Sequence, residues 1–176
     1  KGRTDEGGMR VPCVVRWPAK IPPGSSSGAI TSTLDLLPTA AALAGTELPG
    51  DKVIDGKNIL PILLGKTNAH PREAFYYYQM DQLQAVRSGD WKLFLPMESK
   101  KRNWGKPEGK TELKLFNLAK DIHEDRNLAA QKPEVVKRLL ALAEEAREDL
   151  GDLNRPGKGQ RKAGWVDEPS PRLMVK

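Results

Sequence analysis

The stretch KGRTDEGGMRVP, residues 1–12, is dense in glycine and in charged side chains, and it overlaps the β-branched segment VPCVVRW at residues 11–17. The adjacent Gly7 and Gly8 allow positive φ angles and a close approach of the backbone, which a tight loop beside a ligand requires. Pro12 favours an extended backbone. The stretch therefore predicts a charged loop that leads into a buried strand. The loop is either part of a site for an anionic ligand or a solvated surface turn.

Helical segments follow this expected strand. Residues 36–44 are rich in leucine and alanine and stop at Gly45, a residue type that commonly ends helices. Asp35 precedes them as a natural N-cap, because its carboxylate can accept hydrogen bonds from the free N–H groups of the first turn. We expect the Leu/Ala face of this helix to lie in the core. Residues 59–64 predict a further helical turn, which ends at Gly65.

The second half of the chain has a different pattern. Alternating apolar and polar residues predict strands at residues 74–79, 83–88 and 91–95 and another at residues 112–117. Residues 133–150 repeat apolar side chains at spacings of three and four, which predicts one amphipathic helix. This order of elements favours a small antiparallel sheet with one helix on one face.

Length and composition set broad limits. A chain of 176 residues can bury one ordinary core, and no apolar run approaches the ~20 residues needed to span a bilayer. The single cysteine, Cys13, cannot form an internal disulfide, and we expect it to be a small buried strand residue. The sequence begins at Lys1 without a methionine or an apolar leader, so the expectation is a piece of a longer protein without a signal peptide of its own.

The net charge of +6 is concentrated near the C-terminus, where residues 154–176 hold six Lys or Arg side chains against two acidic ones. A second basic segment lies within residues 96–111. Basic segments of this kind can bind an anionic partner. No motif that reads DNA or RNA accompanies them, so we expect no nucleic-acid partner.

Ordered motifs in the first 65 residues resemble those of sulfatases, of the alkaline-phosphatase-like superfamily. The matching segments are KGRTDEGGMRVP at residues 1–12, KIPPG at 20–24, STLDLLPT at 32–39 and DGKNILP at 55–61. The later strands and helix fit the usual ending of the family more loosely. The resemblance spans most of this chain, but only about the C-terminal third of a typical sulfatase.

This resemblance implies an α+β/α/β chain. Residues 1–70 would be the end of the α/β catalytic domain, and residues 71–153 a small four-stranded antiparallel sheet packed by one C-terminal helix. Residues 154–176 would form a basic, flexible tail. The full-length enzyme would hydrolyse sulfate esters with a formylglycine nucleophile and Ca²⁺.

The resemblance also nominates site residues. Lys1 occupies the position of the lysine that contacts the substrate sulfate in sulfatases. Behind it, Thr4 can hydrogen-bond the loop backbone. Glu6 and Arg10 are spaced to brace the loop by pairing with each other. We expect these three residues to support the site from outside the substrate contacts.

The nucleophile and the metal ligands of the family are not expected in this chain. Residues 13–16 read Cys-Val-Val-Arg and do not match the formylglycine pattern Cys-x-Pro-x-Arg, and the aspartate pairs that hold Ca²⁺ lie earlier in the family. Acidic residues at 121, 124 and 125 predict a solvated connector rather than an EF-hand. His70 and His123 have no ligand partners at zinc spacing. The chain alone is therefore expected to be inactive.

The expected partners are a sulfate-ester substrate and the N-terminal part of the same catalytic domain. The family implies a periplasmic or secreted protein, or a lysosomal one in an animal. Two alternatives stay open. One is a non-catalytic module that binds an anionic, sulfated glycan through its basic segments. The other is a fragment of a related phosphodiesterase or phosphonate hydrolase.

Overall fold

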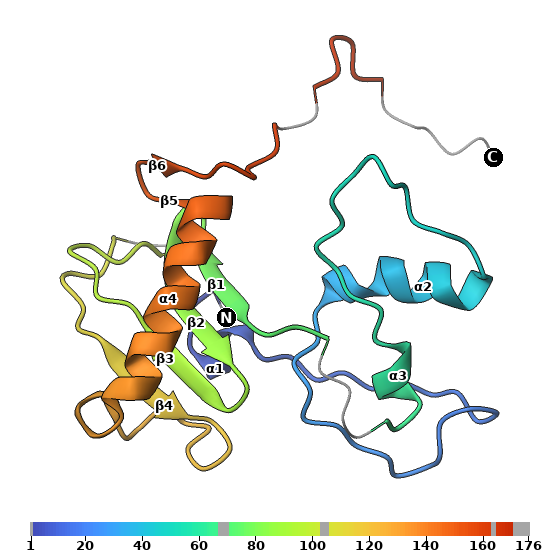
Figure 1. Cartoon of the computed structure of the whole chain (residues 1–176), viewed down its shortest axis with the longest axis horizontal. Helices are drawn as coiled ribbons and strands as arrows, with labels where there is room; N and C mark the ends of the chain where they lie inside the picture. Colours follow the sequence, from blue (N-terminus) through green and yellow to red (C-terminus); the bar gives the residue numbers. More distant parts are fainter. Residues whose placement is uncertain (1, 67–70, 103–105, 163–164, 171–176) are drawn as a thin grey trace.

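The computed structural model of the protein describes residues 2–66, 71–102, 106–162 and 165–170. Its elements lie in two groups (Figure 1), one built around a β-sheet and the long helix α4, the other containing the shorter helices α2 and α3. The N-terminal loop, with the short helix α1 (Glu6–Met9), lies with the sheet. The segment that follows α1 then crosses to the second group.

The sheet is a meander of four antiparallel strands in the order β1-β2-β3-β4. The strands are β1 (Phe75–Gln79), β2 (Gln82–Ser88), β3 (Trp91–Phe94) and β4 (Lys114–Asn117). Gly89, in the turn between β2 and β3, has a φ of 56°, which a side chain would disfavour. The expected strands and their antiparallel arrangement are confirmed.

Helix α4 (Pro133–Leu150) covers one face of this sheet and builds the main core with it. Buried side chains of the sheet and the helix meet there, and they are Leu83, Val86, Leu93, Leu95, Leu115, Leu139, Leu142, Ala143 and Ala146. The 3-10 turn η2 (Ala129–Gln131) precedes the helix, and the short pair β5 (Gly151–Asp152) and β6 (Arg155–Pro156) follows it. The expected amphipathic helix is confirmed, whereas the last two strands were too short for a sequence pattern to reveal.

The face of the sheet away from α4 carries the N-terminal loop. Successive side chains of a strand point to opposite faces. Leu93 packs into the core with α4, so its neighbours Lys92 and Phe94 point to the other face. Lys92 there contacts Glu6 of α1 at 2.9 Å. The sheet thus joins the apolar core to the loop that the sequence singles out.

The second group begins with the 3-10 turn η1 (Thr33–Asp35), followed by α2 (Leu36–Ala44) and α3 (Leu60–Leu63). The boundaries of α2 agree with the expectation, and Gly45 ends it in the left-handed conformation. Asp35 is the N-cap of α2 as expected, but its side chain makes no capping bond to this helix. Its carboxylate instead accepts from the N–H of Ser32, the N-cap of the preceding 3-10 turn.

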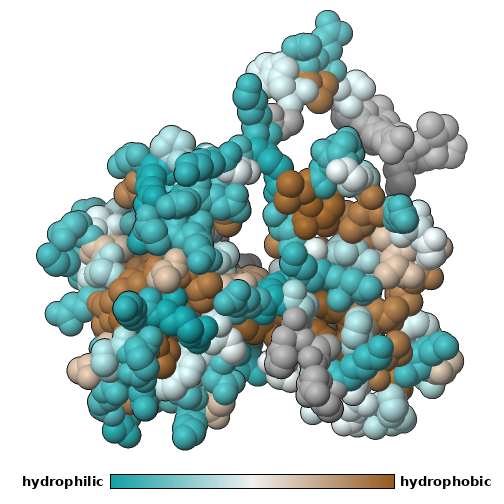
Figure 2. Space-filling view, viewed as in Figure 1, coloured by the Kyte–Doolittle hydropathy of each residue, from teal (hydrophilic) through white to brown (hydrophobic). Residues whose placement is uncertain are grey.

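The Leu/Ala face of α2 does not lie in a core. Leu36 is 65% exposed and Leu37 is 57% exposed, while the buried residues of the helix are Pro38, Thr39 and Ala41. Figure 2 shows exposed apolar side chains on the half of the molecule that carries α2 and α3. The expectation fails because α3 is the helix that contacts α2, and it is too short to cover this face.

The strand expected at residues 11–17 is also absent. These residues have no strand assignment, Val14 is 93% exposed, and Cys13 is exposed rather than buried. A strand is stable only when a neighbour satisfies its backbone groups. In the part of the chain that the structure describes, no strand pairs with this segment. The division into parts at residues 70 and 153 stays a prediction.

Candidate functional site

The N-terminal loop is a tight turn fixed by its own backbone. The N–H groups of Gly8 and Met9 donate to the carbonyl oxygen of Asp5, at 3.0 and 3.1 Å. Gly8 packs so closely that a Cβ atom there would overlap the carbonyl oxygen of Arg3, whereas a Cβ at Gly7 would make only an ordinary contact. Of these two adjacent glycines, the packing therefore requires only Gly8.

Thr4 anchors the loop to the sheet. Its side chain is fully buried, and its hydroxyl donates to Oε1 of Gln84 on β2 at 2.9 Å. Gln84 in turn donates to Gln82 and to the carbonyl oxygen of Lys101. The expected bond from Thr4 to the loop backbone is wrong, because the side chain turns inward to the sheet.

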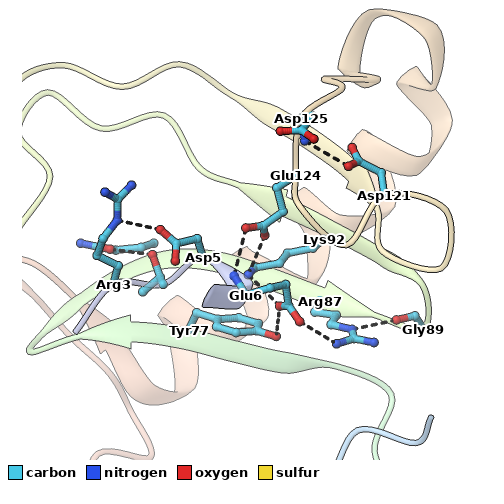
Figure 3. A network of polar contacts seen from close by, with 12 residues as sticks. Arg3, Asp5, Glu6, Tyr77, Arg87, Gly89, Lys92, Asp121, Glu124 and Asp125 are labelled. Carbon is cyan, nitrogen blue, oxygen red and sulfur yellow. Dashed lines mark hydrogen bonds and ion pairs between the residues drawn. The ribbon is translucent and has the colours of Figure 1, made fainter. Parts of the chain in front are cut away.

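Glu6 is the second anchor, and it lies in a network of charged side chains (Figure 3). Its Oε1 accepts a hydrogen bond from Nζ of Lys92 at 2.9 Å, and its Oε2 lies 3.5 Å from Nη1 of Arg87. The expected pairing with Arg10 is wrong. Helix α1 ends at Met9 and Arg10 is extended, so Arg10 is not on the helix face that carries Glu6.

Glu124 closes the network from the turn after β4. Its Oε1 lies 2.8 Å from Nζ of Lys92, and its Oε2 accepts from the backbone N–H of Glu6 at 3.0 Å. The expectation of a solvated connector fails for this residue, whose side chain is 8% exposed. The expectation of a solvated connector holds for Asp125, which is exposed. It holds only in part for Asp121, because the carboxylate of Asp121 accepts hydrogen bonds from the backbone of the turn.

Lys92 has no exposed surface. Besides its two carboxylate partners, Nζ lies 4.4 Å from the ring centroid of Tyr77 and 4.9 Å from that of Phe94, which adds cation–π attraction. Burial and the negative charge of Glu6 raise the pKa of Tyr77 to about 12. Its hydroxyl therefore stays protonated at neutral pH and can donate to Glu6, 3.4 Å away.

A pocket of about 450 Å³ opens beside this network. Loop residues line one side, and sheet and turn residues line the others, including Arg3, Asp5, Phe94, Lys114, Phe116 and His123. Within the described ranges, no group of three or more His, Cys, Asp or Glu residues is arranged to hold a metal ion. The pocket lining combines cationic side chains with four carboxylates, those of Asp5, Glu108, Glu112 and Glu124.

Two of the residues that the sequence singles out, Lys1 and His70, lie outside the described residues. Of the other predicted site residues, Thr4 and Glu6 come together on the sheet, and Arg10 is exposed away from them. Sequence reasoning missed Lys92 and Glu124. The one available signal was Lys92 itself, a charged residue between the apolar residues of a strand.

Comparison with known proteins identifies the family. The profile described as "N-sulphoglucosamine sulphohydrolase, C-terminal" matches residues 3–149. The chain belongs to this family. The resemblance to sulfatases is thereby confirmed, and the match includes both the N-terminal loop and the sheet that holds it.

Curated relatives of this sulfatase C-terminal region are themselves sulfatases. Steryl-sulfatase of Mus musculus is 48% identical over 98 residues, which cover 53% of this chain and 16% of that protein. N-acetylgalactosamine-6-O-sulfatase of Bacteroides thetaiotaomicron is 34% identical over 145 residues, covering 81% of this chain and 28% of that protein. The chain thus spans less than a third of the length of these relatives.

Solved structures confirm the fold of this sulfatase C-terminal region. A Bacteroides thetaiotaomicron protein, described with the metabolism of multiple glycosaminoglycans, matches with a TM-score of 0.66 and 35% identity, over 81% of this chain and 30% of that one. A further solved structure, in complex with its substrate D-glucosamine-2-N,6-O-disulfate, matches with a TM-score of 0.54 and 28% identity, over 75% of this chain and 27% of that one.

In the described part of this sulfatase region, no helix is both long enough and apolar enough to cross a bilayer.

Proposed function

We propose that this chain is the C-terminal part of a sulfatase whose full-length form hydrolyses sulfate esters. The observation that carries the proposal is the N-terminal loop, which matches the sulfatase motif in sequence and is held on the sheet by two buried side chains, Thr4 and Glu6. A loop that is merely a solvated turn needs no such anchors. Family membership over residues 3–149 supports the same assignment.

In this proposal Lys1 contacts the sulfate group. Hydrolysis of a sulfate ester increases the negative charge on the leaving oxygen and on the sulfate oxygens, so a fixed positive charge nearby lowers the barrier. Lysine supplies a compact charge on a flexible stem. Because that stem is flexible, the position of Lys1 depends on how firmly the rest of the loop is held. Thr4 and Glu6 provide that support.

The formylglycine nucleophile and Ca²⁺ belong, in this proposal, to the part of the enzyme that precedes this chain. The described residues do not fit a calcium site, since they contain no cluster of three or more suitable ligands. Glu124, the most buried carboxylate of its turn, already contacts Lys92. Cys13 lacks the formylglycine pattern and is exposed. We therefore expect the chain alone to be inactive.

The exposed apolar residues support a partner that covers them, and we propose the preceding part of the same catalytic domain. Val14, Leu36 and Leu37 are all more than half exposed. Burying a side chain of this kind contributes roughly 1.5–3 kcal/mol. The relatives are more than three times as long as the stretches this chain matches, so each contains enough additional chain to supply such a surface.

For the substrate we propose a sulfated amino sugar. Two observations support this class. A relative that aligns with 81% of this chain is an N-acetylgalactosamine-6-O-sulfatase, and a structural neighbour was solved with D-glucosamine-2-N,6-O-disulfate. The pocket beside the loop adds aromatic and charged groups that suit a sugar ring. We further propose a periplasmic or secreted enzyme, or a lysosomal one in an animal, as in the family generally.

The structure favours the alternative of a polyanion-binding module less, because most basic side chains that it describes in segments 96–111 and 154–176 are already paired. In the segment 96–111, Lys100, Arg102 and Lys110 pair with glutamates, and in the tail Arg155 and Arg161 pair with Glu144 and Asp55. A polyanion would have to displace these carboxylates. Binding to heparin that weakens with salt and is lost on deletion of residues 155–176 would nevertheless support the module.

The test compares the full-length protein with the 176-residue chain. We expect the full-length protein to release sulfate from 6-O-sulfated N-acetylgalactosamine and from an aryl sulfate, and the chain to release none. Lys1→Ala in the full-length protein should lower kcat/KM about a hundredfold. The exposed Lys52→Ala is the matched control and should leave it unchanged. Turnover by the chain alone, or a preference for phosphate or phosphonate esters, would overturn the proposal.

A further inference from the structure

Lys92 is the point where three distant segments meet. Its Nζ contacts Glu6 of the N-terminal loop at 2.9 Å and Glu124 of the turn after β4 at 2.8 Å, while Lys92 itself belongs to β3 (Figure 3). With Arg87, which faces Glu6 at 3.5 Å, the group contains two cations and two carboxylates. The charges therefore balance only when the loop is in place.

Glu124 contacts the loop in a second way. One oxygen of its carboxylate pairs with Lys92, and the other accepts the backbone N–H of Glu6 at 3.0 Å. A single carboxylate thus fixes both the cation and the first residue of α1. Glu124 has a φ of 61°, and Asp121 stabilises its turn by accepting from the N–H groups of Asp125 and Arg126, at 3.1 and 2.9 Å. The position of the carboxylate is therefore set by its own turn.

Stability alone is a weak reason for such a group. Buried ion pairs lose about as much free energy in desolvation as they gain in attraction, and apolar side chains of similar size often replace them without loss. A buried ion pair instead selects one relative position of the two segments that carry the charges. In any other position the charges stay buried without a partner, which costs free energy. Lys92, fixed between the rings of Tyr77 and Phe94, gives the loop one defined position.

We propose that Lys92 and Glu124 are positioning residues for sulfate binding, which they control by fixing the loop that carries Lys1. Neither touches the sulfate in this scheme. Thr4 and Glu6 anchor this loop to the sheet, and Lys1 precedes Thr4 by three positions in the sequence. The inference rests on the proposed sulfatase function and deepens it, because it assigns a role to residues that the sulfatase motif does not contain.

The first experiment measures hydrogen exchange at the amide of Glu6 in the full-length protein. Glu124→Gln keeps the shape of the side chain but removes its charge, so the bond from the Glu6 N–H weakens. We expect this amide to exchange about tenfold faster or more, while the amides of β2 and β3 keep their protection. Asp125→Asn is the matched control, because it makes the same chemical change at the next residue, which is exposed, and it should have no effect.

The second experiment measures KM for a sulfate ester and the inhibition constant of inorganic sulfate with the same full-length variants. A purely structural role lowers the amount of folded enzyme, which reduces the maximal rate but leaves both constants unchanged. A positioning role raises both constants, and we expect at least a tenfold rise for Glu124→Gln and for Lys92→Met. Glu124→Asp, which retains the charge on a shorter stem, should recover part of the loss.

The outcomes separate the two proposals. Unchanged exchange at Glu6 in Glu124→Gln overturns the inference whatever the activity. Faster exchange with unchanged KM and unchanged inhibition by sulfate also overturns it, and leaves the sulfatase assignment intact. If the unaltered full-length protein releases no sulfate from any ester, the proposed function fails and the role in sulfate binding fails with it. Faster exchange together with both constants raised supports the inference.

Discussion

The guanidinium of Arg72 donates a hydrogen bond to the carboxylate of Asp35, and both side chains are buried. Arg72 lies just before β1, and Asp35 lies at the start of α2, so this pair joins the sheet group to the helical group. The same carboxylate accepts from the backbone N–H of Ser32 at 2.7 Å and from that of Lys57 at 2.8 Å. One side chain therefore fixes the start of α2, a distant loop and the approach to the sheet.

Asp35→Ala should destabilise the chain strongly. It leaves the guanidinium of Arg72 buried without its counter-charge and removes the acceptor of two backbone N–H groups, and breaking a buried ion pair in this way costs about 3–5 kcal/mol. The measurement is the midpoint of urea unfolding, followed by circular dichroism. Asp51→Ala, at an exposed position, is the control and should change little. Equal midpoints for both variants would contradict the role assigned to Asp35.

Gly8→Ala and Gly7→Ala should differ sharply although they are adjacent. A Cβ atom at position 8 would overlap the carbonyl oxygen of Arg3, whereas at position 7 the nearest atom is the Asp5 carboxylate, 3.7 Å away. We expect Gly8→Ala to displace the loop and to raise KM for a sulfate ester in the full-length enzyme. Gly7→Ala should leave KM within about twofold of the original value. Similar effects of the two variants would show that the packing at Gly8 is relaxed in solution.

Leu93→Ala and Leu37→Ala should report on the two apolar surfaces. Leu93 is fully buried against α4, so its truncation should cost about 2–5 kcal/mol in the isolated chain. Leu37 is 57% exposed, so its truncation should cost less than about 0.5 kcal/mol there. In the full-length protein the cost of Leu37→Ala should increase if, as proposed, the preceding part of the domain covers this side chain. Urea unfolding of both proteins measures this, and an unchanged small cost would argue against that partner.

Alkaline pH should destabilise the fold through Tyr77, which is buried, and Tyr78, which is partly buried. Burial, with Glu6 nearby, raises the pKa of Tyr77 from 10.0 to about 12, and burial, with Asp152 nearby, raises that of Tyr78 to the same value. Because the folded pKa lies above the unfolded one, this contribution to stability is complete below pH 10 and is lost as the pH rises through about 12. The urea midpoint should therefore fall in this interval, and less steeply in Tyr77→Phe. Phenolate absorbance of the folded protein provides an independent measurement of when the tyrosines ionise.

Local patterns predicted the regular elements well. Helix α2 begins and ends where its leucines, alanines and Gly45 indicate, and the strands of the sheet follow from short alternating runs with Gly89 in one turn. These elements are decided by interactions between residues close in sequence. The amphipathic stripe of α4 likewise indicated which side would face the sheet.

Contacts between segments that lie far apart in the sequence could not be predicted from sequence patterns. The segment 11–17 has the composition of a buried strand but no strand partner among the described residues, so it stays exposed. The burial of Lys92 could not be predicted either, because in this case the partners exist but lie far away in the sequence. Its burial depends on Glu6 and Glu124, which come from two remote segments, and no local pattern shows that carboxylates will converge there.

The division of packing within the chain has a consequence for its synthesis. The sheet and α4 share one core, whereas α2 and α3 contact each other and leave apolar surface uncovered. Residues 75–150 can therefore collapse around α4 as soon as that helix has left the ribosome, while the helical group that precedes them depends, in the proposal made above, on earlier parts of the protein for cover. A ribosome that stalls before α4 would leave the apolar face of the sheet open, because the side chains that cover it, Leu139, Leu142, Ala143 and Ala146, all come from that helix.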